Sequence, residues 1–337
     1  MPSARTLHLF WPVLLYAQLG WSQSGRPGAA KLHDAGASSF TIIPLGVKGG
    51  LDESNLSAYM VAPEGSHDYI CLDAGTLYSG IRRAVNAGVF GSPMGHRPDP
   101  SFVLRHYIKA YFISHPHLDH VAGLILNSPD DSAKTIYGLP SCLDVLKGNY
   151  FTWEAWANFG DAGEKPFLSK YHYSVLSPGQ EEAVGNTAFH ITAFPLSHGA
   201  PYQSTAFLVR HEEAYLLYLG DTGADTVEHS DKLHLLWQEI APLLKTGQLK
   251  AIMIEVSFPD EQPLRQLFGH LTPFLLMKEM SALSTLTGKQ ALSGLPVLIT
   301  HLKPSGDQET RIRKQLTASN PLNLKLIFPE QAVRIDL

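Results

Sequence analysis

The chain has 337 residues, of which 44% are hydrophobic and 17% are charged. This composition supports a large buried core, and it excludes both a disordered chain and a disulfide-stapled miniprotein. The 26 Lys and Arg residues against 31 Asp and Glu residues give a net charge of −5, without the basic stripe of a nucleic-acid binder. Two cysteines are too few for a thiolate zinc finger or an iron–sulfur cluster, so any metal must be bound by imidazole and carboxylate groups.

The N-terminal segment has the pattern of an export signal. Arg5 is the only charged residue among the first 25, and a mostly apolar run over 7–19 precedes small and polar residues at 20–28. The apolar run is shorter than the ~20 residues that cross a membrane, and no other stretch comes near that length. We therefore expect a signal peptide over 1–24, a Gly/Ala-rich linker over 25–37 and an exported, periplasmic protein, with a cytoplasmic location as the alternative.

From residue 40 onward, short β-type runs alternate with helical segments. The β-type runs are apolar and end in a polar residue, as strands buried in a sheet do. They predict strands over 40–47, 57–62, 69–73, 110–114, 189–196, 204–210, 214–221, 250–258 and 296–302. Helices are expected over 118–127, 231–247, 272–286 and 307–316, and the Gly- and Pro-rich stretch 84–105 predicts a long loop. The two groups of strands favour a single-domain α/β sandwich over 38–337.

The strongest motif is a cluster of four residues of metal-ligating type within six positions. His115, His117, Asp119 and His120 directly follow the apolar run 110–114. Two residues apart in an extended segment, His115 and His117 point to the same side, whereas Asp119 and His120 turn with the chain toward a second point nearby. This arrangement suits two cations a few ångströms apart.

Three further candidate ligands close apolar strand runs later in the chain. His198 follows the run 189–196, Asp221 follows 214–219 and His301 follows 296–300. Polar residues at strand ends can converge at one edge of a sheet. A set of imidazoles and carboxylates suits zinc, with manganese or iron as alternatives.

The order of these motifs resembles that of the metallo-β-lactamase superfamily. This resemblance covers residues 40–337 and implies an αβ/βα sandwich with a two-metal site at one edge. It implies that Asp221 bridges the two ions. The other ligands would divide into two sets, namely His115, His117 and His198 for one ion, and Asp119, His120 and His301 for the other. Asp73 in Cys-Leu-Asp-Ala-Gly-Thr matches the superfamily's first motif, where an Asp orients the histidine loop, but it also fits an ordinary turn residue.

Within that superfamily, several stretches resemble the class II cyclic-nucleotide phosphodiesterases. These are residues 46–61, 114–131, 254–258 and 267–273. The family converts 3′,5′-cyclic AMP, and in some members cyclic GMP, to the 5′-nucleotide. A metal-bridging hydroxide would attack phosphorus. His270 is the candidate proton donor to the 3′ leaving oxygen, and Glu255 is the carboxylate that orients it.

Other functions on the same scaffold remain as alternatives. A tRNA 3′-processing endonuclease would share the metal ligands, but it needs a basic surface that the net charge does not provide. A lactonase, β-lactamase, sulfatase or non-catalytic metal-binding module is a further alternative. We expect a small cyclic nucleotide as substrate and no nucleic-acid partner. The sequence assigns no residue to base recognition and leaves the oligomeric state open, with a homodimer among the alternatives.

Overall fold

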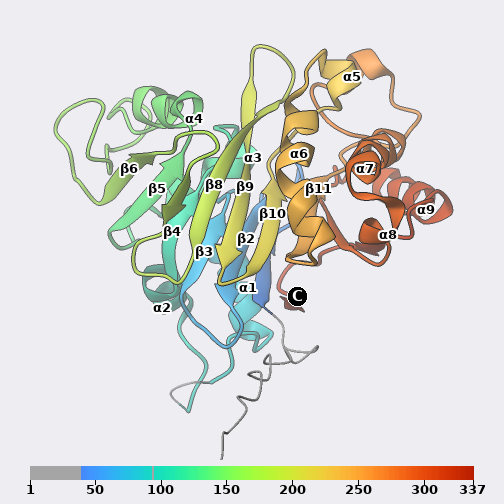
Figure 1. Ribbon diagram of the computed structural model, residues 1–337. Helices are drawn as coiled ribbons and strands as arrows, with labels where there is room; N and C mark the ends of the chain where they lie inside the picture. Colours follow the sequence, from blue (N-terminus) through green and yellow to red (C-terminus); the bar gives the residue numbers. More distant parts are fainter. Residues whose placement is uncertain (1–38, 93–94) are drawn as a thin grey trace, which may run out of the picture. The chain divides into compact units, whose positions relative to one another are not determined.

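The computed structural model describes residues 39–92 and 95–337. The predicted signal peptide and linker lie outside this range. The described residues form two seven-stranded sheets with helices on their outer faces (Figure 1). No helix in these two segments is both long and apolar enough to cross a membrane.

Within each sheet, neighbouring strands are consecutive in the chain, except for β14, which pairs with β1. The first runs β14 (Ile335–Asp336), β1 (Phe40–Gly46), β2 (Ala58–Pro63), β3 (Tyr69–Leu72), β4 (Ile108–Phe112), β5 (Lys134–Gly138) and β6 (Tyr171–Val175). The second runs β13 (Lys325–Ile327), β12 (Pro296–Thr300), β11 (Leu249–Glu255), β10 (Ala214–Leu219), β9 (Gln203–His211), β8 (His190–Ser197) and β7 (Glu181–Ala183).

Helices cover the outer face of each sheet. Beside the first sheet are α1 (Tyr78–Asn86), α2 (Pro100–Phe102), the π-helix η1 (Val103–Tyr107), α3 (Leu118–Asn127), α4 (Pro140–Val145) and the π-helix η2 (Leu146–Tyr150). Beside the second are α5 (Asp225–Glu228), α6 (Lys232–Lys245), the 3₁₀ turn η3 (Leu264–Gln266), α7 (Pro273–Thr287), α8 (Lys289–Leu292) and α9 (Gln308–Ala318).

Alternation along the strands explains the layered core. In β1, Phe40 and Ile42 pack between the sheets, whereas Ile43 and Leu45 pack beneath the helices of the first sheet. Trp237 of α6 fills the corresponding layer beside the second sheet. Because both faces of each sheet are buried, most strands read as continuous apolar runs. The predicted α/β sandwich is therefore confirmed.

The predicted loop over 84–105 is wrong at both ends. Helix α1 continues to residue 86, and a helical segment occupies 100–107. The Asp99 side chain accepts a hydrogen bond from Ser101 N at 2.8 Å, and Pro100 begins the helix, so the turn residues initiate helix here.

Strand β5 was not predicted, because it begins with Lys134, whose ammonium group pairs with buried Asp131.

Strand direction brings the candidate ligands to one edge. Strands β3 and β4 run parallel in the first sheet, and β10, β11 and β12 run parallel in the second. Strand β8 has the same direction as β10, because each is antiparallel to β9. The polar residues that follow these strands therefore emerge at their carboxyl ends, where α/β folds form sites.

Candidate metal centre

The histidine loop between β4 and α3 is held in place by close backbone packing. Gly75 of the β3–α1 loop lies so close that a Cβ there would be 2.1 Å from the Asp119 carbonyl oxygen. Ala74 N donates to His120 O at 2.8 Å, and Gly123 N of α3 donates to Gly75 O at 2.9 Å. Only glycine at position 75 allows this approach, which fixes the loop on the first sheet.

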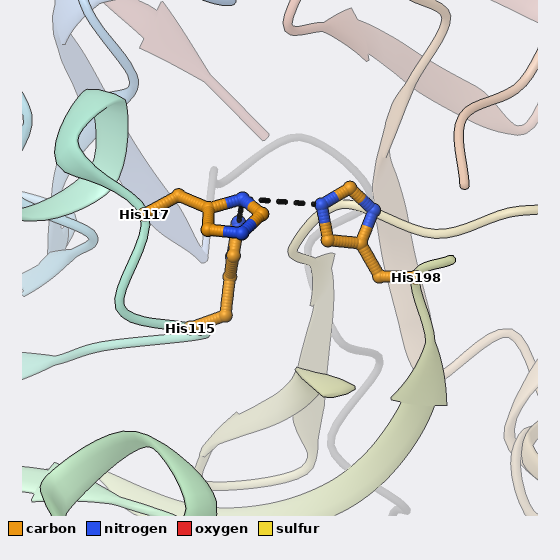
Figure 2. A group of neighbouring side chains, drawn as sticks. All are labelled: His115, His117 and His198. Atoms are coloured by element: carbon orange, nitrogen blue, oxygen red, sulfur yellow. Dashed lines mark hydrogen bonds between the residues drawn. The ribbon is translucent and has the colours of Figure 1, made fainter. Parts of the chain in front are cut away.

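Three imidazoles form the first candidate cation site. His115 Nε2 lies 3.1 Å from His117 Nδ1, which lies 3.3 Å from His198 Nε2. Figure 2 shows the rings of His115 and His117, from the histidine loop, directed toward His198 at the end of β8. Four ligands at ~2.1 Å around a tetrahedral ion lie about 3.4 Å from each other, so this spacing suits one cation.

Asp119, His120 and His301 form the second candidate site. His301 Nε2 lies 3.2 Å from Asp119 Oδ2. Burial opposes ionisation of the Asp119 carboxyl, but the adjacent His120 and His301 imidazoles outweigh burial and hold its pKa below the usual range. Asp119 is therefore a carboxylate, the form that binds a cation.

Asp221 lies between the two groups. Its Oδ2 oxygen is 3.2 Å from His301 Nε2, 3.3 Å from His120 Nε2, 3.6 Å from His115 Nε2 and 3.8 Å from His198 Nε2. The carboxylate is buried, and its pKa is low because the imidazoles of His301 and His120 outweigh the cost of burial. One anionic oxygen thus faces imidazoles from both groups.

The chemistry of this donor set fits divalent cations. The His120 Nε2 atom is buried without a hydrogen-bond partner. Burial lowers the pKa of His117 to about 4 and also holds that of His115 well below its usual range, so both imidazoles are neutral and have lone pairs to offer. Burial also disfavours charge on His120, but the carboxylates of Asp221 and Asp73 outweigh it and raise its pKa. Positive charge is therefore favoured where the second cation would bind.

Asp73 orients one of the candidate ligands. Its Oδ2 atom accepts hydrogen bonds from His120 Nδ1 and Ser114 Oγ, each at 2.7 Å, and from the Tyr218 hydroxyl at 2.5 Å. Because the carboxylate accepts, His120 carries a proton on Nδ1, and Nε2 is the ring atom directed toward Asp221. Of the two interpretations that the sequence left open for Asp73, the structure supports hydrogen bonding to the histidine loop.

Glu255 and His270 form a buried pair beside the candidate cation sites. Glu255 Oε1 lies 2.7 Å from His270 Nδ1, and Oε2 accepts from Ser257 Oγ at 2.5 Å. Burial, followed by the negative charge of Asp221, raises the pKa of Glu255 to about 7. Burial lowers the pKa of His270 to about 4. His270 Nδ1 is 3.9 Å from Asp221 Oδ2, so the general acid predicted from the sequence adjoins the predicted bridging ligand.

The structure thus brings all the sequence-predicted site residues into one cluster. Their division into two ion-binding sets and a proton-donating pair stays a prediction, because His270 also lies within ligand distance of His198 and Asp221. Ser257 was not singled out from the sequence. Its Oγ lies 2.9 Å from His301 Nδ1 and links that ring to Glu255. The sequence feature that could have identified Ser257 is its position two residues after Glu255, on the same side of an extended segment.

Gly269 allows two site loops to cross. A Cβ at this position would lie 2.3 Å from Gly199 N and 2.4 Å from His198 C, and its φ is +78°. The Gly269 carbonyl accepts a hydrogen bond from His198 Nδ1 at 2.9 Å. This contact leaves Nε2 of His198 free for a ligand, so Gly269 determines both the position and the tautomer of that ring.

We expect Gly269→Ala to destabilise the protein by about 2–4 kcal/mol, because it adds a steric clash to the cost of a left-handed alanine. Urea denaturation measures this loss. Gly247→Ala is the matched control, since Gly247 has a φ of +71° and nothing within 4 Å of its Cβ position. Equal losses in the two variants would show that the crossing tolerates a methyl group.

The chain matches a family of known enzymes over most of its length. The profile of the family "cAMP phosphodiesterases class-II" matches residues 38–326. A 3′,5′-cyclic-nucleotide phosphodiesterase of Aliivibrio fischeri is 44% identical, with 88% of this chain and 92% of the relative covered. A probable 3′,5′-cyclic-nucleotide phosphodiesterase of Yersinia pestis is 39% identical, over 87% of this chain and 88% of the relative.

Solved structures agree on the fold. Unliganded yeast PDE1 superposes with a TM-score of 0.79 at 24% identity, and the match covers 89% of this chain and 100% of the yeast chain. A metallo-β-lactamase fold protein from Bacillus subtilis has a TM-score of 0.58 at 17% identity, with 89% and 99% covered. The family match over residues 38–326 shows that the chain belongs to the class II cyclic AMP phosphodiesterases, and its fold is the metallo-β-lactamase fold.

Proposed function

We propose that this chain hydrolyses 3′,5′-cyclic AMP to 5′-AMP, with cyclic GMP as a further substrate. We also propose that it uses two divalent cations, zinc in the first place, with manganese or iron(II) as alternatives. Membership of the family and the names of the relatives from A. fischeri and Y. pestis support the reaction. The observation that carries the metal-dependent part is the single oxygen of Asp221 that faces imidazoles of two groups.

Seven side chains would hold the cations, namely His115, His117, Asp119, His120, His198, Asp221 and His301. When bound, the two ions would neutralise the phosphodiester charge and lower the pKa of a water between them, so that hydroxide is available near neutral pH. The chain's own hydrogen bonds prepare the imidazoles for this role. Asp73, Gly269 and Ser257 each contact an Nδ1 atom, which leaves Nε2 of His120, His198 and His301 directed inward.

His270 would supply the proton that the departing 3′ oxygen needs. Its Nδ1 atom is occupied by Glu255, so Nε2 is the atom available to the substrate. Glu255 fixes this tautomer and stabilises the imidazolium that precedes proton transfer. Ser257 and Thr222 N each hydrogen-bond to the Glu255 carboxylate, at 2.5 and 3.0 Å, and hold it in place.

A product analysis tests this function. The full-length protein is incubated separately with cyclic AMP, cyclic GMP, a linear dinucleotide, a precursor tRNA and a β-lactam, and the products are separated by chromatography. We expect 5′-AMP from cyclic AMP, activity that a chelator abolishes, and recovery with zinc or manganese.

Two outcomes contradict different parts of the proposal. Turnover of the linear dinucleotide, tRNA or β-lactam with cyclic AMP left intact would exclude a cyclic-nucleotide phosphodiesterase. Full turnover of cyclic AMP by protein shown to be metal-free would leave the reaction in place and remove the proposed role of the cations.

A further inference from the structure

Two large aromatic side chains are exposed on loops that carry site residues. Tyr202 is 59% exposed and Phe268 is 70% exposed. Tyr202 lies four residues after His198, and Phe268 lies two residues before His270. Neither ring is buried in the core, and both residues lie on loops that carry residues of the candidate site.

Both aromatic residues flank the point where the two loops cross. Tyr202 N donates to Gly199 O at 3.0 Å, and its ring lies edge-on to His117 with 5.1 Å between ring centres. On the other loop, the Phe268 carbonyl carbon is 3.3 Å from the Cβ position of Gly199. The Tyr202 ring therefore lies beside His117, whose ring faces His198 in Figure 2, and the Phe268 backbone lies against the loop that carries both His198 and Tyr202.

The backbone holds Phe268 outward at a conformational cost. Its φ is +52°, in the left-handed region that bulky residues avoid. Leu267 on one side is 1% exposed, and Gly269 on the other is packed against the backbone of His198. The backbone of Phe268 is thus fixed between two anchored neighbours, and its side chain is exposed. Backbone strain of this kind persists at functional positions, where the surrounding structure imposes it.

We propose that Tyr202 and Phe268 form the surface that binds the purine ring of the cyclic nucleotide. This proposal rests on the proposed function, which places the phosphate between the two groups of cation ligands. A base attached to that phosphate through one ribose reaches only the immediate rim of the site. Aromatic rings bind bases through their flat faces whatever the base's hydrogen-bonding groups, which suits an enzyme that accepts both adenine and guanine.

Product analogues with and without a base test this role separately from catalysis. The inhibition constants of 5′-AMP and of ribose 5-phosphate are measured for the wild type, Tyr202→Ala and Phe268→Ala. Loss of one stacking partner should raise the constant for 5′-AMP, and the KM for cyclic AMP, by about 5- to 150-fold. Ribose 5-phosphate lacks the base, so its inhibition constant should not change.

Three further variants serve as controls. Tyr202→Phe keeps the ring, so both inhibition constants should equal those of the wild type. Phe268→Asn removes the ring but suits the left-handed backbone, so its inhibition constants should equal those of Phe268→Ala. Phe274→Ala removes an aromatic ring of comparable exposure, 66%, which lines a separate cavity of about 720 Å³ with Leu264 and Val227. It should leave both inhibition constants unchanged.

The inference is overturned if 5′-AMP and ribose 5-phosphate lose affinity equally, or if neither changes in the alanine variants. It is also overturned if size-exclusion chromatography shows that these variants dissociate a dimer, because the rings would then form a contact between subunits. If the wild type neither hydrolyses cyclic AMP nor binds 5′-AMP, the proposed function fails together with this inference. If the wild type hydrolyses cyclic AMP and the alanine variants keep its inhibition constant for 5′-AMP, the proposed function stands and only this inference fails.

Discussion

Replacing His270 with alanine should lower kcat for cyclic AMP by about 10²- to 10⁴-fold, the usual contribution of a general acid. The 3′ oxygen leaves as an alkoxide of high pKa and needs a proton, whereas an aryl phosphodiester releases a phenolate of much lower pKa. The loss on a nitrophenyl diester should therefore be far smaller. Steady-state kinetics on both substrates, with metal analysis of each preparation, measure this difference.

Glu255→Gln is the companion variant. The amide still contacts His270 Nδ1 at the position that Glu255 Oε1 occupies, 2.7 Å away, but it no longer stabilises the imidazolium. The same selectivity between substrates should appear in weaker form. Equal losses on both substrates would contradict the general-acid role. Loss of metal in His270→Ala would instead identify His270 as a ligand, which its position next to His198 and Asp221 also permits.

Replacing Asp221 with alanine should have an equally large effect for a different reason. Its Oδ2 atom faces imidazoles of both candidate cation sites, so the variant should lose metal from both. Because two bound cations would contribute several kcal/mol of transition-state stabilisation, activity on cyclic AMP should fall by about 10³-fold or more. Unlike His270→Ala, this variant should lose activity on cyclic AMP and the nitrophenyl diester alike.

Metal content and stability provide readouts that do not depend on turnover. A ligand that binds only the folded state raises Tm, so zinc should stabilise the wild type and have little effect on Asp221→Ala. Asp130→Ala, which removes an exposed carboxylate near the end of α3, is the control and should respond to zinc like the wild type. Two zinc ions per chain in Asp221→Ala would show that this carboxylate does not bridge them.

The sequence by itself determined the features that depend on local spacing. The histidine loop could be identified because four candidate ligands fall within six residues, and α3 begins and ends where the pattern predicts, at residues 118 and 127. The continuous apolar strands predicted a sandwich, because both faces of each sheet are buried. Helix α1 and strands β5 and β6 were not predicted because none of them is a continuous apolar run: polar residues interrupt α1 and β6, and β5 begins with the paired charge of Lys134.

Tertiary structure alone decided how distant residues support one another. Asp73 contacts His120 because β3 lies beside β4, and Glu255 reaches His270 because the loop after β11 folds back over the strand end. The exposure of Tyr202 and Phe268 was equally invisible in the sequence, since an aromatic residue gives the same signal in a core as at a rim. Spacing along the chain fixes which groups are available, but the pairing of strands and the crossing of loops fix which of them meet.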